Sequence, residues 1–89
     1  MYKLIITDDF EKQFRKLDRA VQVMVKKWMI KHFSDDADPK DSGRPLSADK
    51  KGYWRYRIGD YRLLAEIRDR ELIIIAIGIA HRSTVYRNR

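Results

Sequence analysis

Hydrophobic positions in the first third of the chain form a short strand-like run, which is followed by a helical period. Residues 2–7 are rich in β-branched and aromatic side chains, which favours a strand. After it, apolar residues recur at the spacing of one helix face: Phe10, Phe14 and Leu17. Asp8 or Asp9 can cap this helix, and acidic groups suit its first turn. The pattern therefore predicts a strand followed directly by an amphipathic helix.

A second helical period begins at Asp18 or its neighbour, where the first period breaks. Its apolar stripe contains Val21, Met24, Val25 and Trp28, extended by Phe33 or Met29. Lys26, Lys27 and Lys31 fall largely outside the stripe, and we expect these lysines and His32 on the solvated surface. The two segments predict an antiparallel helical hairpin, which needs a sheet to cover it.

Residues 35–52 have the composition of a loop, because Asp, Ser, Gly and Pro are frequent there. Pro39 and Pro45 argue against regular structure in this region. One apolar residue, Leu46, is expected to return to the core.

From Tyr53 the hydrophobic period changes from helical to two, which is typical of strands. Trp54, Tyr56 and Ile58 fall on one face, and Tyr53, Arg55 and Arg57 fall on the other. Gly59-Asp60 is a two-residue turn with glycine first, as a type II′ hairpin requires. The apolar face continues on the returning strand through Tyr61, Leu63, Ala65 and Ile67.

A second turn at Asp69-Arg70 leads into a strand over residues 72–80, which is nearly all apolar and contains five isoleucines. Such a strand is expected to be central and covered on both faces. The chain is thus predicted to be a single α+β domain over residues 1–89. Its N-terminal strand and helical hairpin precede a three-stranded antiparallel meander, which forms one sheet packed on the helices.

Composition narrows the class of partner. The net charge is +7 and the isoelectric point is about 9.9, which favours a polyanion. Residues 1–34 carry six lysines and two arginines, whereas residues 53–89 carry eight arginines and no lysine. Guanidinium groups make planar, bidentate contacts with phosphate, so the use of arginine alone in residues 53–89 favours a partner that is bound through such directional contacts. The chain has no cysteine, no signal-like apolar region, and no apolar run beyond nine residues, and we expect a soluble cytoplasmic protein.

The hairpin register brings like charges together. If Gly59-Asp60 is the turn, Arg57 lies directly opposite Arg62 and Arg55 lies opposite Leu64. Facing arginines destabilise a strand pair, so an anion that bridges Arg55, Arg57 and Arg62 would turn the repulsion into a binding site. Glu66, opposite Tyr53, can instead neutralise part of the cluster.

Two segments carry a resemblance to a known family. Residues 52–62 read Gly-Tyr-Trp-Arg-Tyr-Arg-Ile-Gly-Asp-Tyr-Arg, and residues 80–87 read Ala-His-Arg-Ser-Thr-Val-Tyr-Arg. With the predicted order of elements, they resemble the RelE branch of the RelE/ParE toxin superfamily over essentially the whole chain. The resemblance implies an endoribonuclease that cuts mRNA in the ribosomal A site, contacts rRNA, and is held inactive by a RelB-like antitoxin.

The implied cleavage is a metal-free attack of a 2′-hydroxyl on its neighbouring phosphate, with no cofactor. Arginine does not transfer protons at neutral pH, which leaves charge stabilisation and substrate alignment to the arginines of the motifs and tail. The expected catalytic residues are His81, Tyr86, Arg62 and Arg82, and the expected RNA-binding residues are Arg55, Arg57, Tyr53 and Arg87. His81 is one candidate for proton transfer, with Tyr86 as the other or as a stacking platform. Lys50 or Lys51 can contribute only if it reaches the site.

Two other functions remain open. A ParE-like toxin shares the fold but inhibits DNA gyrase and does not need the arginine, histidine and tyrosine set. A basic RNA- or DNA-binding module predicts salt-dependent binding without cleavage. In a toxin, the antitoxin is expected to lie along the groove of the first helix or across the basic sheet. The lysines of the second helix can touch rRNA or simply face solvent.

Overall fold

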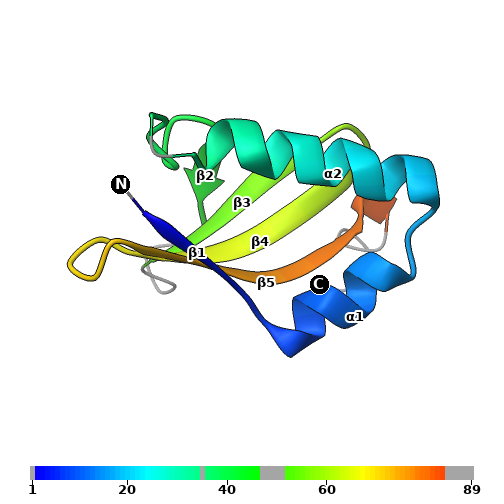
Figure 1. Ribbon diagram of the computed structural model, residues 1–89, viewed down its shortest axis with the longest axis horizontal. Coiled ribbons are helices and arrows are strands. Elements are labelled where there is room, and N and C mark those ends of the chain that lie inside the picture. The colour runs from blue at the N-terminus through cyan, green and yellow to red at the C-terminus, as the bar shows by residue number, and fades with distance from the viewer. Residues whose placement is uncertain (1, 35, 47–51, 84–89) are drawn as a thin grey trace.

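The computed structural model describes residues 2–34, 36–46 and 52–83, and it places two helices on one face of a five-stranded sheet (Figure 1). The elements are β1 (Lys3–Ile6), α1 (Asp8–Arg15), α2 (Arg19–His32), β2 (Gly43–Pro45), β3 (Tyr53–Ile58), β4 (Tyr61–Arg68) and β5 (Ile73–His81). Their spatial order is β1-β5-β4-β3-β2, with β1 parallel to β5 and the other pairs antiparallel. The predicted α+β class is confirmed. We call the sheet surface opposite the helices the far face.

The start of α1 differs from the prediction. Thr7, not an aspartate, is the N-cap: its Oγ1 accepts a hydrogen bond from the Phe10 N–H at 3.1 Å. Asp8 and Asp9 occupy the first turn, where carboxylates favour the positive end of the helix dipole. The Thr7 hydroxyl also donates to the Ala76 carbonyl at 2.8 Å, so the first turn of α1 is anchored on β5.

The second helix begins as predicted, with Asp18 as its N-cap residue. Val25, Met29 and Phe33 lie at i, i+4 and i+8, and all three are buried against the sheet. Met24, predicted in the stripe, is 38% exposed because it lies at the margin of this face. His32 is partly exposed, and its half-buried ring lies 4.4 Å from the Trp28 ring.

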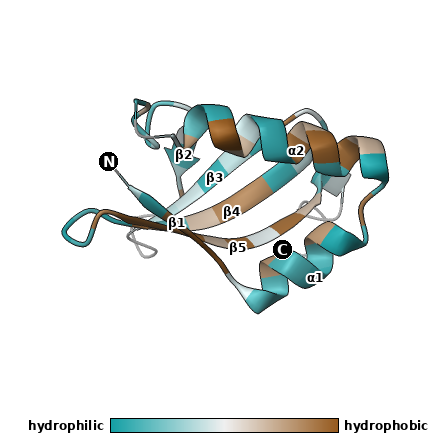
Figure 2. Cartoon of the chain, in the orientation of Figure 1, coloured by the Kyte–Doolittle hydropathy of each residue, from teal (hydrophilic) through white to brown (hydrophobic). Residues whose placement is uncertain are grey.

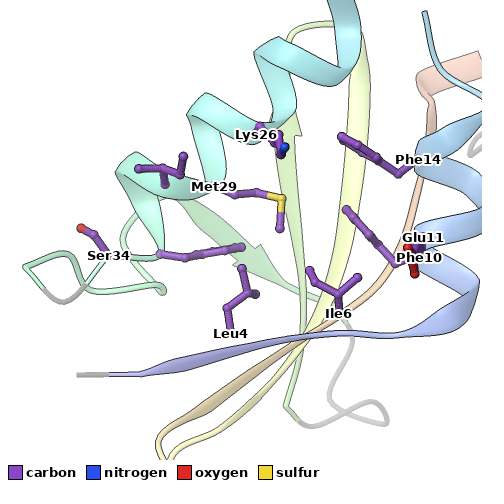
Figure 3. A pocket seen from close by; sticks show the side chains of 10 residues that line it. Leu4, Ile6, Phe10, Glu11, Phe14, Lys26, Met29 and Ser34 are labelled. Carbon is purple, nitrogen blue, oxygen red and sulfur yellow. The ribbon is translucent and has the colours of Figure 1, made fainter. Parts of the chain in front are cut away.

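The two helices diverge over the sheet, with α1 over β5 and α2 over β3. Between them lies an apolar groove of about 770 Å³ (Figure 3). Its lining includes Leu4 and Ile6 of β1, Phe10 and Phe14 of α1, and Met29 and Ile30 of α2. No helix among the described residues is long and apolar enough to cross a membrane.

The predicted loop contains a short edge strand, which the sequence reasoning missed. Residues 43–45 form β2 and pair with β3, where Pro45 is tolerated because an edge strand does not need every N–H. A Cβ at Gly43 would lie 2.5 Å from the Tyr56 ring, so only glycine fits at this crossing. The residue that returns to the core is Pro39, which is fully buried, whereas Leu46 is only half-buried.

The β3–β4 hairpin has the predicted register. Ile58 pairs with Tyr61 and Arg57 with Arg62, around a turn in which Gly59 has φ +58°. The apolar face is confirmed too, since Tyr56, Leu63 and Ala65 are completely buried beneath the helices and Ile58 and Ile67 nearly so.

The last strand only partly matches its prediction. It begins at Ile73, because Leu72 has φ +55° and ends a turn that runs from Asp69, two residues longer than expected. β5 lies inside the sheet, and Figure 2 shows its hydrophobic character beside that of β1. Its residues are buried only toward the helices, at Ile74, Ala76 and Ile79. Cover on both faces was therefore wrong, since Ile73, Ile75 and Ile77 are half-buried.

The Tyr56 hydroxyl donates to the Pro39 carbonyl at 2.6 Å inside the core. Tyr56→Phe should lower the free energy of unfolding by about 1 kcal/mol or more, because the Pro39 carbonyl loses its buried donor. Tyr2→Phe is the matched control: its hydroxyl donates to Asp69 at 2.8 Å in an exposed position, where water can replace it. Urea denaturation at pH 7 measures both. Equal losses would contradict the structural role of the buried bond.

Burial raises the pKa of the Tyr56 phenol above its ordinary value. The unfolded chain therefore releases this proton first, at a pH of about 10, and the contribution of Tyr56 to stability falls as the pH rises beyond that value. The difference in unfolding free energy between the wild type and Tyr56→Phe should thus shrink between about pH 9 and 11. A difference that stays constant with pH would contradict the burial of this hydroxyl.

Candidate functional site

Four arginines gather on the far face of β2, β3 and β4. Arg57 lies opposite Arg62, as predicted, and Arg44 lies opposite Arg55. All four line one polar cavity of about 430 Å³, together with Asp41, Ser42 and Gly43. We call Arg44, Arg55, Arg57 and Arg62 the arginine cluster.

Strand geometry explains why the four side chains meet. Successive side chains alternate between faces, and paired residues share a face. On β3 the buried Tyr56 and Ile58 turn Arg55 and Arg57 outward. On β2 the contact of Gly43 with the Tyr56 ring places the next residue, Arg44, on the far face.

Arg44 is the site residue that the sequence reasoning missed. Pro45 had argued against regular structure, although proline is compatible with an edge strand. A usable signal was present: Gly43-Arg44-Pro45 precedes the arginine-bearing strand in an otherwise acidic segment.

The arginine cluster is not neutralised by carboxylates of the described residues. Within that part of the chain, no carboxylate oxygen lies within 4.0 Å of a cluster guanidinium. Glu66, which was a candidate for this role, instead binds Arg68 at 3.0 Å. Asp41 lines the cavity and makes no ion pair with another described residue. Facing like charges cost stability, and a bound anion would remove that cost.

Arg62 is the most restrained member of the cluster. It is 8% exposed, and its Nη1 donates to the carbonyls of Tyr61 at 2.9 Å and Gly59 at 3.2 Å. A guanidinium buried without a counter-charge is expensive, so this position favours an anionic ligand. The Ser42 hydroxyl, which lies in the same cavity lining, is also buried and has no hydrogen-bond partner among the described residues.

His81 lies at the same end of the sheet as Arg62 but on the opposite face. It pairs with Tyr61, and their rings meet edge to face with centroids 5.3 Å apart. The imidazole is exposed, and its Nδ1 accepts the Ser83 N–H at 3.2 Å and lies 2.9 Å from the Ser83 hydroxyl. An Nδ1 that accepts a hydrogen bond corresponds, in a neutral imidazole, to the tautomer with its proton on Nε2.

Of the other predicted site residues, the structure describes Arg82 and Tyr53. Arg82 is exposed beside the β3–β4 turn, where its N–H donates to the Asp60 carbonyl at 2.8 Å. Tyr53 lies on the far face opposite Glu66, but it does not line the arginine cavity. The predictions for Tyr86 and Arg87 fall outside the described residues, as do those for Lys50 and Lys51.

Comparisons with known proteins agree over nearly the whole length. A family model described as the ParE toxin of type II toxin-antitoxin system, parDE, matches residues 4–86. A search of curated protein sequences finds no match.

Among solved structures, the chain is similar to a toxin–antitoxin complex, RelBE2, from Mycobacterium tuberculosis, with 27% identity and a TM-score of 0.77. That match covers 91% of this chain and 98% of the other. The isolated E. coli RelE toxin matches with 22% identity and a TM-score of 0.70, over 98% and 93% of the two chains. The intact E. coli RelBE complex matches with 17% identity and a TM-score of 0.70, over 91% and 96%. The two E. coli matches show the fold alone.

If the arginine cluster holds phosphates, single substitutions should change the salt dependence of RNA binding. Arg55→Ala and Arg57→Ala should each make the negative slope of log K against log salt shallower by about 0.7 on single-stranded RNA. Arg70→Ala is the charge-matched control, because Arg70 lies in the turn between β4 and β5, at the other end of β4. Fluorescence anisotropy at several salt concentrations measures the slopes. Equal changes in all three variants would mean that the binding is non-specific.

Proposed function

We propose that this chain is a RelE-type endoribonuclease toxin. It belongs to the family of ParE toxins of type II toxin–antitoxin systems, within the RelE/ParE superfamily. In this proposal it cuts mRNA in the ribosomal A site and so inhibits translation. The arginine cluster is the observation that carries the proposal: four guanidinium groups share one cavity and have no carboxylate partner among the described residues.

The chemistry is a transfer within the RNA, and it needs no metal in this proposal. The 2′-oxygen forms a bond to the adjacent phosphorus, and the bond to the 5′-oxygen of the next nucleotide breaks. A base takes the 2′-proton, and an acid protonates the leaving 5′-oxygen. Negative charge develops on the phosphorane between these two events, and it must be stabilised by fixed positive groups.

Arg62 fits the stabilising role best. Its guanidinium is held by two carbonyls and the residue is largely buried, so it needs little reorganisation when charge develops. Arg44, Arg55 and Arg57 are more exposed and suit the alignment of the neighbouring phosphates.

Proton transfer is assigned to His81 and Tyr86, with Arg82 and Arg87 close to them in sequence. His81 lies on β5 beside Tyr61, on the helix side of the sheet, and the Arg82 N–H donates to the Asp60 carbonyl in the Gly59-Asp60 turn. The RNA in this proposal therefore follows the far face and bends over the turn, which brings the scissile phosphate between Arg62 and His81.

A cognate antitoxin is the proposed partner, as similar chains have been crystallised in RelB–RelE complexes. The apolar groove between α1 and α2 suits the hydrophobic side of such a protein. An acidic antitoxin segment over the arginine cluster would compete directly with RNA.

A gyrase inhibitor is the second candidate, because the matching family model is that of the ParE toxin. In that case the arginine cluster and His81 are dispensable for toxicity. A binding module without catalysis would give growth inhibition without new RNA ends.

Induced expression followed by mapping of mRNA 5′ ends tests the proposal. The wild type should create new ends in translated regions. His81→Ala should reduce them by about 10²–10⁴-fold and Arg62→Ala by about 10²–10³-fold, because they remove a proton-transfer group and a charge stabiliser. Circular dichroism of each purified variant controls for folding, and Arg70→Ala should cleave like the wild type.

Plasmid supercoiling measured in the same cultures separates the two toxins. Growth arrest with a loss of gyrase supercoiling and without new mRNA ends would overturn the nuclease proposal in favour of the ParE-like function.

A further inference from the structure

The strand that carries His81 contains a β-bulge. Leu64 pairs with Gly78, but the next residue of β4, Ala65, pairs with Ala76. Ile77 is therefore an extra residue on β5 with no partner of its own on β4. A bulge of this kind shifts the alternation of every side chain that follows it.

The shift determines the face on which His81 lies. Before the bulge, Ile74 and Ala76 point toward the helices, and after it Ile79 and His81 do so with their partners Leu63 and Tyr61. Uninterrupted alternation from Ala76 would place His81 on the far face, with the arginine cluster. The bulge is thus responsible for the contact of His81 with Tyr61.

The polar groups that stabilise the bulge come from outside the sheet. The Gln13 side chain, on α1, accepts the Ile79 N–H through Oε1 at 2.7 Å. Gly78 makes room for it, since a Cβ there would lie 3.0 Å from the same oxygen. On the other side of the bulge, the Thr7 hydroxyl donates to the Ala76 carbonyl and lies 3.3 Å from the Ile77 carbonyl. Backbone groups freed by the bulge are therefore satisfied by α1 and its cap.

We propose that Gln13 is a positioning residue for His81. Its amide oxygen accepts the Ile79 N–H and so stabilises the bulge at Ile77, and the bulge places the imidazole beside Tyr61, at the end of the sheet where the β3–β4 turn lies. Gln13 does not touch the substrate in this proposal and acts through the register of β5. The importance of the position for cleavage rests on the proposed function, whereas the register itself does not.

The test compares Gln13→Met, which keeps the length of the side chain but removes the acceptor, with Gln22→Met. Gln22 donates from Nε2 to the Leu17 and Arg15 carbonyls between the helices and has no hydrogen bond to β5, so it is the matched control. In Gln13→Met, hydrogen exchange of the Ile79 amide should become about tenfold faster. The His81 ring protons should lose the ring-current shift from Tyr61, and mRNA cleavage should fall by about 100-fold because His81 is misplaced.

Gln13→Glu provides the rescue, because its carboxylate retains an acceptor at neutral pH. It should keep the His81 ring resonances of the wild type, even where Gln13→Met folds too poorly to study. The proposal is overturned if those resonances are unchanged in Gln13→Met, if Gln22→Met moves them equally, or if Gln13→Glu fails to retain them. A wild type without new mRNA ends would reject the nuclease function alone, since the spectroscopic result still decides the role of Gln13.

Discussion

The buried ring of Tyr56 fixes β3 between its neighbours, and the geometry of the far face depends on it. The ring is fully buried against Trp28 and Phe33, and its hydroxyl binds the Pro39 carbonyl. Gly43 passes directly beside it, so the same residue also locates β2. Because Tyr56 faces the helices and successive side chains of a strand alternate, Arg55 and Arg57 point to the far face. A hydrophobic contact in the core thereby determines where positive charge collects on the surface.

The arginine cluster lowers the stability of the sheet that carries it. Two pairs of arginines face each other across strands, Arg44 with Arg55 and Arg57 with Arg62. The two guanidinium groups of each pair repel one another, and Arg62 also loses most of its contact with water. Sites that bind charged ligands commonly retain such local costs, because the ligand compensates them when it arrives.

The sequence was most informative where local chemistry decides the structure. Gly59-Asp60 and the regular alternation around it were sufficient to predict which residue of β3 faces which residue of β4. Arg44 escaped prediction because pairing of β2 with β3 depends on a contact between Gly43 and a distant aromatic ring. The bulge in β5 could not be predicted, because one extra residue within an apolar run leaves no local signal. Gln13, which accepts the Ile79 N–H beside the bulge, lies 66 positions away from Ile79 in the sequence. Tertiary contacts therefore decided the two features that most affect the site.

The parallel pairing of β1 with β5 has a kinetic consequence for the newly made protein. Lys3 pairs with Ile73 and Ile6 with Ala76, so contacts that close the sheet join residues 70 positions apart. Such long loops are slow to close, and β1 and the anchored end of α1 have no surface to rest on until β5 has been synthesised. The nascent chain therefore passes through a stage in which β1 and the apolar side of α1 exist before the strand that they pack on. In that interval the chain is exposed to chaperones, to proteases and to any partner that recognises unfolded polypeptide.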